Sequence, residues 1–412
     1  MNSRHRLPPV WLMGLSNATL GFSSGITLFL LPQLMATAHV PEAKIATITA
    51  VGSSAGFWFV FFSPILDVRI SRRRYATLLA ALSGAAAATA LLSVHNLAAL
   101  QIAMVVCFAS AILSSTALGG WLSNIIPPEH KNPLSKWMNI AVISGTGVIV
   151  AAGGEFAKGL PAKSAALLTG AIVFLPTAIF LFMPAPGPDR RLASESFQQF
   201  NREVLSLLKR REVVIVLLLF LSPCSTFVLP NLLGGLGADF HASARTVSLS
   251  GGAGAFVPGL IGCFLFPVVA KRLRLRSFYF ANGILGCLFT LSLVILPHTS
   301  FTFALAVFGE FLFQAIAFSI QIAIVFEAIG PDNPLAATTF AFLTAATNIP
   351  VTYLTVIDGQ AYSIAGITGT FFVDAMVGIG ACLAAAILLA KLGSARTGMS
   401  PLIQAETASE ET

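Results

Sequence analysis

The sequence predicts an all-α membrane protein in which twelve transmembrane helices form two six-helix halves. Hydrophobic residues make up 56% of the 412 positions and charged residues only 10%, whereas a soluble domain carries about 25% charge. The apolar runs are about 20 residues long and do not alternate with period two, which favours helices over a barrel. Helices and closed barrels are the two structures that can span a bilayer.

The first apolar run follows Arg4 and Arg6 and extends from Val10 to Met35. A signal peptide has an apolar region of about 7–15 residues, so we interpret this run as a retained first helix. The first half is expected to span at 10–36, 45–65, 75–94, 98–122, 137–155 and 164–184. The second half is expected to span at 212–235, 246–269, 278–297, 301–327, 337–357 and 367–391.

A long polar segment rich in Ser, Gln and Arg separates the sixth span from the seventh. We therefore expect an N-terminal six-helix bundle over 1–184 and a cytoplasmic linker over 185–211. A C-terminal six-helix bundle over 212–396 and a cytoplasmic tail over 397–412 complete the expected organisation.

Lysine and arginine set the expected orientation, because cytoplasmic segments of membrane proteins carry an excess of both. With the N-terminus inside, twenty of the 24 fall on the cytoplasmic side, and the exceptions are Lys44, Lys158, Lys163 and Arg245. We expect a multi-pass protein of the bacterial inner membrane with both termini in the cytoplasm. The net charge of +7 then reflects topology and predicts no nucleic-acid binding.

The two halves also resemble each other in sequence. Phe29–Leu34 reads Phe-Leu-Leu-Pro-Gln-Leu, and Phe227–Leu232 reads Phe-Val-Leu-Pro-Asn-Leu. The pairs His39 and His241, Pro64 and Pro267, and His95 and His298 repeat at offsets of 202, 203 and 203. Internal repeats are typical of transporter folds.

The loop after the second span, Ser63–Arg74, contains Asp67 and several arginines. With six-plus-six helices and a cytoplasmic linker, it resembles the signature between helices two and three of the major facilitator superfamily. That resemblance implies gating roles for Asp67, Arg69 and Arg72, since a charge pair at a helix end can hold one state closed. The alternative interpretation is that these basic residues only set the orientation of the helices in the membrane, and that one acid lies among them. The matching loop of the second half has Ala270 where the acid would stand.

Within that superfamily the chain resembles the AmpG-type permeases for peptidoglycan breakdown products and the related acetyl-CoA transporters. The segments that carry the resemblance are Gly21–Gly25, Ser63–Pro64 with Asp67 and Arg72–Arg74, Pro127–Glu129, and Ala336–Leu343. Members that carry muropeptides tend to have acids in helix four and an arginine in helix five. This chain has Ser114–Gly120 and Ile143–Gly145 there, and no lysine or arginine is expected to be buried in any span.

The resemblance implies that helices one, four, seven and ten line the cavity, and each of those spans has polar candidates. We expect substrate contacts from Asn17, Ser114, Thr226, Gln314 and Gln321, and from Asn348 in the eleventh span. Small polar residues also hold transmembrane helices together, so helix packing is the alternative role.

The tenth span, Phe301–Glu327, carries Glu310, Gln314 and Gln321 in an otherwise apolar run. At 100° per residue these fall at roughly 0°, 40° and 20° and share one stripe. Polar groups inside a membrane are costly and should face a cavity or another helix. We expect Glu310 to couple transport to protons, with Asp374 as a second candidate. A structural acid is the alternative, and Glu155, Glu327 and Asp358 are expected at helix ends.

The sequence contains no pattern typical of an enzyme, since it lacks a nucleophile–base cluster, a P-loop and a dinucleotide fingerprint. The five cysteines lie in apolar runs without disulfide or metal spacing. We therefore expect no catalytic residue, no metal and no cofactor.

We predict a monomeric secondary active transporter that works by alternating access in the lipid bilayer. It would move a small polar metabolite, such as a peptidoglycan-derived sugar, together with protons. One alternative is an exporter of lipophilic or cationic compounds, for which an arginine-free, Phe-rich cavity is suited. A non-transporting membrane sensor or accessory protein is the alternative of another class.

Overall fold

The computed structural model describes residues 7–67, 70–184, 205–233, 236–243, 246–247, 250, 253–330 and 333–397. Within these ranges every regular element is a helix and no strand occurs. Nine of the described helical segments are long and apolar enough to cross a membrane. The prediction of an all-α membrane protein is confirmed.

The first half contains six helical passes, several of them assembled from shorter segments. The first pass is α1 (Val10–Leu15), α2 (Ala18–Gly25), η1 (Ile26–Leu30) and α3 (Leu31–Thr37), and the second is α4 (Glu42–Ser53), α5 (Ala55–Trp58) and η2 (Phe59–Asp67). The next two are α6 (Arg72–Leu92) and α7 (Leu97–Ile125). The last two are η3 (Pro128–His130) with α8 (Lys131–Gly159), and α9 (Ala162–Phe174) with η4 (Leu175–Leu181).

The second half begins with α11 (Arg211–Leu221) and α12 (Leu229–Leu232), followed by η6 (Gly237–Phe240). The remaining helices are α14 (Ala253–Ala270), α15 (Leu275–Ile295), α16 (Ser300–Ile329) and α17 (Ala336–Thr397). The end of the expected linker is described from Leu205 onward, whereas 185–204 and the tail from 398 lie outside the described residues.

Helix α17 is two passes joined by a tight turn. Its 62 residues are interrupted at Ala365 and at Gly366, where φ is 61°. Glycine occupies this positive-φ position without the steric cost that a Cβ would bring. A 20-residue helix already spans the membrane core, so α17 is long enough to cross twice. Together with the shorter α14 and the α11–α12 pair, the described helices are consistent with the twelve expected spans.

The seventh pass corrects one prediction, because 212–235 is not a continuous helix. Helix α11 ends at Leu221, where the backbone of Ser222 becomes extended, and Ser225 adopts φ 51°. Pro223 has no backbone N–H to donate and its ring clashes with the preceding helical turn, which explains the break. Such non-helical backbone is tolerated at membrane depth only where protein groups satisfy it. Here Tyr353 donates to the carbonyl of Leu221 at 3.1 Å.

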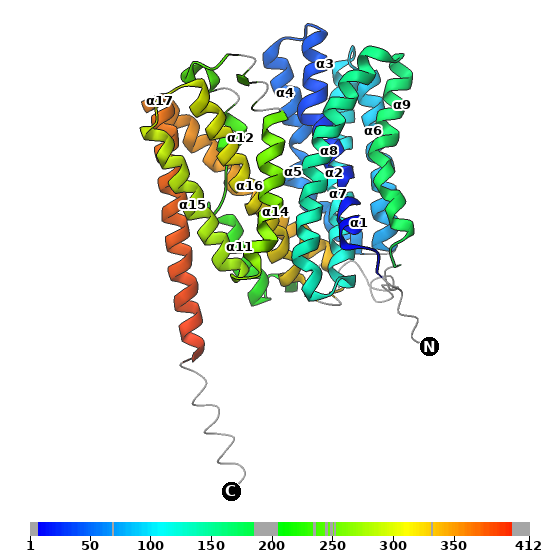
Figure 1. Ribbon diagram of the computed structural model, residues 1–412. Coiled ribbons are helices and arrows are strands. Elements are labelled where there is room, and N and C mark those ends of the chain that lie inside the picture. Colours follow the sequence, from blue (N-terminus) through cyan, green and yellow to red (C-terminus); the bar gives the residue numbers. More distant parts are fainter. Residues whose placement is uncertain are drawn as a thin grey trace, which may run out of the picture.

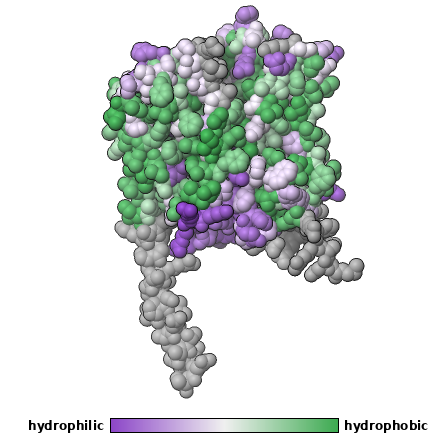
Figure 2. Space-filling view, viewed as in Figure 1, coloured by the Kyte–Doolittle hydropathy of each residue, from purple (hydrophilic) through white to green (hydrophobic). Residues whose placement is uncertain are grey.

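The passes stand side by side, and α1 begins at the same end of the bundle at which α17 ends (Figure 1). We call this end the terminal side and the opposite end, which carries the break in α17, the distal side. Apolar residues cover the middle of the visible face, and polar residues lie toward both ends (Figure 2). Large apolar side chains such as Phe61 and Leu181 are 80% and 73% exposed, as expected for a surface that faces lipid.

The largest core cluster joins the two halves near the terminal side. It brings Trp121 and Leu122 of α7 together with Phe326 of α16 and with Phe340 and Leu343 of α17. These side chains are at most 4% exposed. Apolar packing therefore closes the terminal half of the seam between the two bundles.

Candidate functional site

A buried ion pair of the first half lies at this seam on the terminal side. The Nε of Arg72 lies 2.7 Å from Oδ1 of Asp67, and the two residues are 3% and 1% exposed. The Arg72 guanidinium also donates to the carbonyl of Pro334 at 2.6 Å and, at 3.4 Å, to that of Asn333, which precede α17. Arg72 of the first half is thus held against the second half.

The Asp67 carboxylate also binds the beginning of α17. Its oxygens accept the backbone N–H of Ala337 at 3.2 Å and of Thr338 at 2.8 Å, and the Thr338 hydroxyl at 2.7 Å. A carboxylate at a helix N-terminus satisfies unpaired N–H groups and complements the helix dipole. We call Asp67, Arg72, Asn333, Pro334 and Thr338 the terminal gate. Arg69 lies outside the described residues.

A second set of contacts between the halves runs from α8 to α16. Lys131 donates to the carbonyl of Phe326 at 2.8 Å, Ser135 donates to the carbonyl of Ser319, and Asn139 donates to the carbonyl of Ala315 at 3.0 Å. The three donors are spaced four residues apart and share one face of α8. Sequence reasoning missed this row because its acceptors are backbone carbonyls, which leave no pattern in the sequence.

Gly120 of α7 packs directly against the start of α17. An added Cβ would lie 2.5 Å from the Ala337 nitrogen and 2.6 Å from its Cα. We predict that Gly120→Leu separates α7 from α17, at a cost of about 1–3 kcal/mol for overpacking. Amide hydrogen exchange at Ala337 and Thr338 should then become faster. Gly154→Leu is the matched control, because nothing lies within 4 Å of its added Cβ. Unchanged exchange in Gly120→Leu would contradict this packing.

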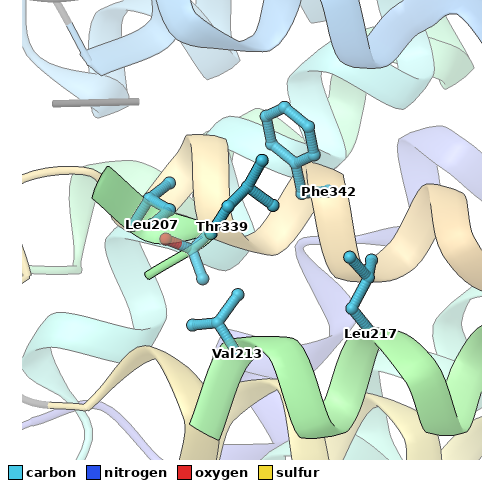
Figure 3. Close-up of a pocket in the computed structure, with 6 residues that line it drawn as sticks. Leu207, Val213, Leu217, Thr339 and Phe342 are labelled. Carbon is cyan, nitrogen blue, oxygen red and sulfur yellow. The ribbon is translucent and has the colours of Figure 1, made fainter. Parts of the chain in front are cut away.

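The end of the expected linker also contacts α17 near the gate. Leu207 is 3% exposed and lies beside Val213 and Leu217 of α11 and Thr339 and Phe342 of α17 (Figure 3). The pocket that these side chains leave is about 10 Å³, which is room for about one water molecule. This site therefore anchors the linker and is too small for a ligand.

A larger cavity of about 450 Å³ lies between the two halves, at mid-depth and toward the distal side. Its size is within the usual range of small-molecule sites. Its lining is largely apolar, with four phenylalanines and three neutral polar side chains. The phenylalanines are Phe29, Phe256, Phe311 and Phe318, and the polar residues are Gln33, Thr146 and Gln314.

Of the six expected substrate residues, Gln314 lines this cavity. Asn17 accepts a hydrogen bond from Ser115, Ser114 donates to the carbonyl of Ala76, and Gln321 donates to the hydroxyl of Tyr279. Asn348 bridges the halves by donating to the carbonyl of Gly56 at 3.0 Å. In this conformation these four serve helix contacts, and their binding of substrate stays a prediction, as does that of Thr226.

Gln314 connects the cavity to the broken seventh pass. Its amide donates to the carbonyl of Phe227 at 2.9 Å, within the segment between α11 and α12. Asn282 of α15 donates to the Ser225 hydroxyl in the same segment at 2.8 Å. Discontinuous helices whose backbone groups face a binding site are typical of transporters.

Glu310 does not line this cavity, and its carboxyl group contacts α15. It is 1% exposed, and its Oε1 accepts the Thr290 hydroxyl at 2.6 Å, whereas Oε2 has no partner. Asp374 is 6% exposed. Asp358 is fully buried and neither of its oxygens has a partner. The expectation that Asp358 lies at a helix end is wrong, since the helix continues from Ile357 to Ile364.

Comparison with known proteins adds a family and several similar folds. A family model described as Major Facilitator Superfamily matches residues 13–334. The Escherichia coli fucose:proton symporter FucP is 16% identical, with a TM-score of 0.70 over 92% of this chain and 98% of that one. No curated protein matches the chain.

Two further solved structures have a similar fold. The proton:xylose symporter XylE, bound to 6-bromo-6-deoxy-D-glucose, is 13% identical, with a TM-score of 0.65 over 91% of this chain and 94% of that one. A bacterial homologue of the iron transporter ferroportin, in an outward-facing state, is 15% identical, with a TM-score of 0.63 over 94% and 100%. These identities show the fold alone.

Proposed function

The chain belongs to the Major Facilitator Superfamily, and we propose that it is a proton-coupled secondary active transporter that works by alternating access. The observation that carries this proposal is the asymmetry of the seam. The terminal gate and the α8–α16 row close the terminal side, while a cavity remains between the halves. Reversing this asymmetry would carry a bound molecule across the membrane.

The terminal side is proposed to be cytoplasmic, because the expected loops there hold most of the lysines and arginines. On that assignment the conformation is closed to the cytoplasm, with its cavity toward the outer side of a bacterial inner membrane. The chain would operate as a monomer made of the two bundles and the linker expected from the sequence.

Glu310 is the proposed proton-coupling residue, with Asp374 as a second candidate. Two observations support it: Glu310 is buried in the middle of α16, and the same helix carries Gln314 at the cavity one turn away. Gain or loss of a proton at Glu310 would change its contact with Thr290, and α16 could transmit that change to the cavity.

The first substrate candidate is a peptidoglycan-derived sugar or a related polar metabolite, taken up with protons. The resemblance to AmpG-type permeases supports it, and two proteins of similar fold are named as proton symporters of fucose and xylose. Gln33, Thr146 and Gln314 could bind sugar hydroxyls in the cavity.

The second candidate is export of a lipophilic or weakly cationic compound. The four phenylalanines of the cavity favour it, because aromatic faces bind apolar groups and cations. None of the fifteen residues that line this cavity is charged, so neither sign of charge on the substrate has a direct partner there.

Flux into proteoliposomes with an imposed pH gradient tests the proposal. Anhydro-muropeptides would be compared with a panel of lipophilic cations, and vesicles without protein serve as the control. Gradient-dependent accumulation of one class assigns the substrate and supports coupling. Absence of protein-dependent flux for both classes would favour a non-transporting sensor or accessory protein and contradict the proposal.

Gln314→Leu is predicted to separate the two substrate candidates. If the substrate is a polar sugar, loss of one hydrogen bond of about 1–1.5 kcal/mol should raise KM about tenfold. If it is lipophilic, KM should stay the same or fall. Gln360→Leu is the matched control, because Gln360 is exposed and lies near the distal end of the same half. A tenfold change in the control would invalidate this interpretation.

A further inference from the structure

We propose that Asp358 belongs to the coupling site and that Glu310, Asp358 and Asp374 form one proton-holding cluster, separate from the cavity. This inference rests on the proposed proton coupling and extends it from one residue to three. It concerns the second half alone, where α15, α16 and both passes of α17 meet.

Helix lengths place the three carboxyl groups at similar depth. Asp358 stands seven residues before the break at Ala365, and Asp374 stands eight residues after Gly366. Glu310 stands ten residues after Ser300, where α16 begins on the distal side. At 1.5 Å per residue these positions lie roughly 10–15 Å below the distal ends of their helices.

Hydrogen bonds and close contacts link the helices at this level. Thr290 of α15 donates to Glu310. Thr370, one turn before Asp374, donates to the backbone carbonyl of Asp358 at 3.3 Å. Gly378, one turn after Asp374, lies so close to Cys287 that an added Cβ would be 2.4 Å from its Sγ.

The acids also interact with one another, and most of their oxygens have no hydrogen-bond partner. Asp358 interacts electrostatically with both Glu310 and Asp374, and Cys287 of α15 is the further titratable group that faces the latter two. Four carboxyl oxygens have no hydrogen-bond partner: Oε2 of Glu310, both oxygens of Asp358 and Oδ1 of Asp374.

Unpartnered buried oxygens of this kind indicate a bound ligand, because an ionised carboxylate is very costly to bury alone. A proton is the ligand that fits, because it neutralises a single buried carboxylate and needs no further groups around it. A proton that adds to one carboxylate would lower the electrostatic repulsion on the other two. When that proton is released to water on the opposite side, the repulsion would return. Neighbouring acids of this type titrate as a unit.

The position of the cluster has a consequence for coupling. Glu310 belongs to it, while Gln314, one turn farther along α16, lines the cavity. Protons and substrate would therefore bind one helical turn apart on α16 and need not compete for the same groups. Asp358 and Asp374 act in this scheme through Glu310 and make no contact with the substrate.

Infrared spectroscopy of the full-length protein in lipid vesicles tests the cluster with protons as the probe and no substrate present. The carboxylic C=O band would be followed while the buffer pH is stepped, in wild type, Glu310→Gln, Asp358→Asn and Asp374→Asn. In Asp358→Asn, one contribution to the band should disappear. The remaining acids should then release their protons at a pH lower by about one unit, because a repelling neighbour is gone.

Two further variants complete the test. Asp239→Asn removes an acid outside the cluster, which accepts a hydrogen bond from Tyr362, and should leave the titration unchanged. Asp358→Glu keeps the acid and should restore the wild-type titration if Asp358→Asn acts through charge and not through misfolding. If Asp358→Asn removes its own band and leaves the other acids unshifted, the cluster is refuted while coupling by Glu310 can stand. If the bands shift but flux ignores the pH gradient, the cluster stands and the proposed coupling fails.

Discussion

Asp67→Ala is expected to weaken closure of the terminal side by about 3–5 kcal/mol, because Asp67 accepts three hydrogen bonds from α17 and a hydrogen bond to a charged group contributes about 1.5–3 kcal/mol. Arg72 would be left 3% exposed without its carboxylate. The N–H groups of Ala337 and Thr338 would lose their acceptor at the same time. The protein should therefore populate a conformation that is open on the terminal side.

Labelling of Cys263 measures this shift. Its thiol is fully buried in the seam and accepts a hydrogen bond from Asn139, so it should react only when α8 separates from α14 and α16. In Asp67→Ala the labelling rate, followed by mass spectrometry of that cysteine, should rise more than about 100-fold, since each 1.4 kcal/mol is a factor of ten. A rate equal to wild type would contradict a closing role for Asp67.

The surface pair of Arg276 and Glu212 provides the matched control. Its atoms lie 2.6 Å apart, but the side chains are 37% and 59% exposed. Exposed ion pairs contribute little, so Glu212→Gln should leave Cys263 labelling unchanged. Replacing Asp67 and Arg72 together by apolar residues should cost less than replacing Asp67 alone, because the buried guanidinium is then removed together with its carboxylate.

The gate illustrates what a sequence can and cannot predict about such a site. Asp67 and Arg72 were identifiable from a local motif, because acid and base stand five residues apart. Their partners in the second half were not, since Asp67 contacts Thr338, 271 positions away. The backbone groups at Asn333 and Pro334 carry no side-chain signal at all. A local motif therefore identifies the residues on one side of an interface, and only the structure shows their partners on the other side.

The passes themselves were predictable because burial in lipid requires long apolar runs, and these runs are visible in composition. The interruptions within these helices were less predictable. The seventh span is apolar enough on both sides of Ser222–Val228 to be drawn as one helix, although the helix is interrupted there. Hydropathy measures transfer from water and not backbone geometry. The same limit misplaced Asp358, because a span expected to end at 357 continues by seven residues to Ile364.

The direction of the polar stripe on α16 was also beyond the sequence. Periodicity predicts that Glu310, Gln314 and Gln321 share one face of the helix. It does not predict which other helix that face contacts. Glu310 and Gln321 contact Thr290 and Tyr279 of α15, and Gln314 reaches the cavity and Phe227. Which helix lies opposite depends on packing between segments far apart in the chain, so side-chain partners follow only from the fold.

Glu310→Gln is expected to abolish accumulation of substrate against its gradient. With one proton moved per substrate, wild type can accumulate about tenfold for each pH unit, because one pH unit corresponds to about 1.4 kcal/mol. Glutamine cannot gain or lose a proton at neutral pH, but its amide oxygen can still accept the Thr290 hydroxyl. The helix contact is therefore retained, and movement down a substrate gradient should continue.

The measurement is proteoliposome uptake of the substrate found in the flux screen, with and without an imposed pH gradient. Glu310→Gln should reach equal concentrations on both sides in either case, at a downhill rate within a few-fold of wild type. Glu327→Gln is the control, because this acid lies on the same helix but is exposed near its terminal end. That variant should accumulate substrate normally. If Glu310→Gln still accumulates substrate about tenfold per pH unit, then Glu310 does not carry the coupling proton.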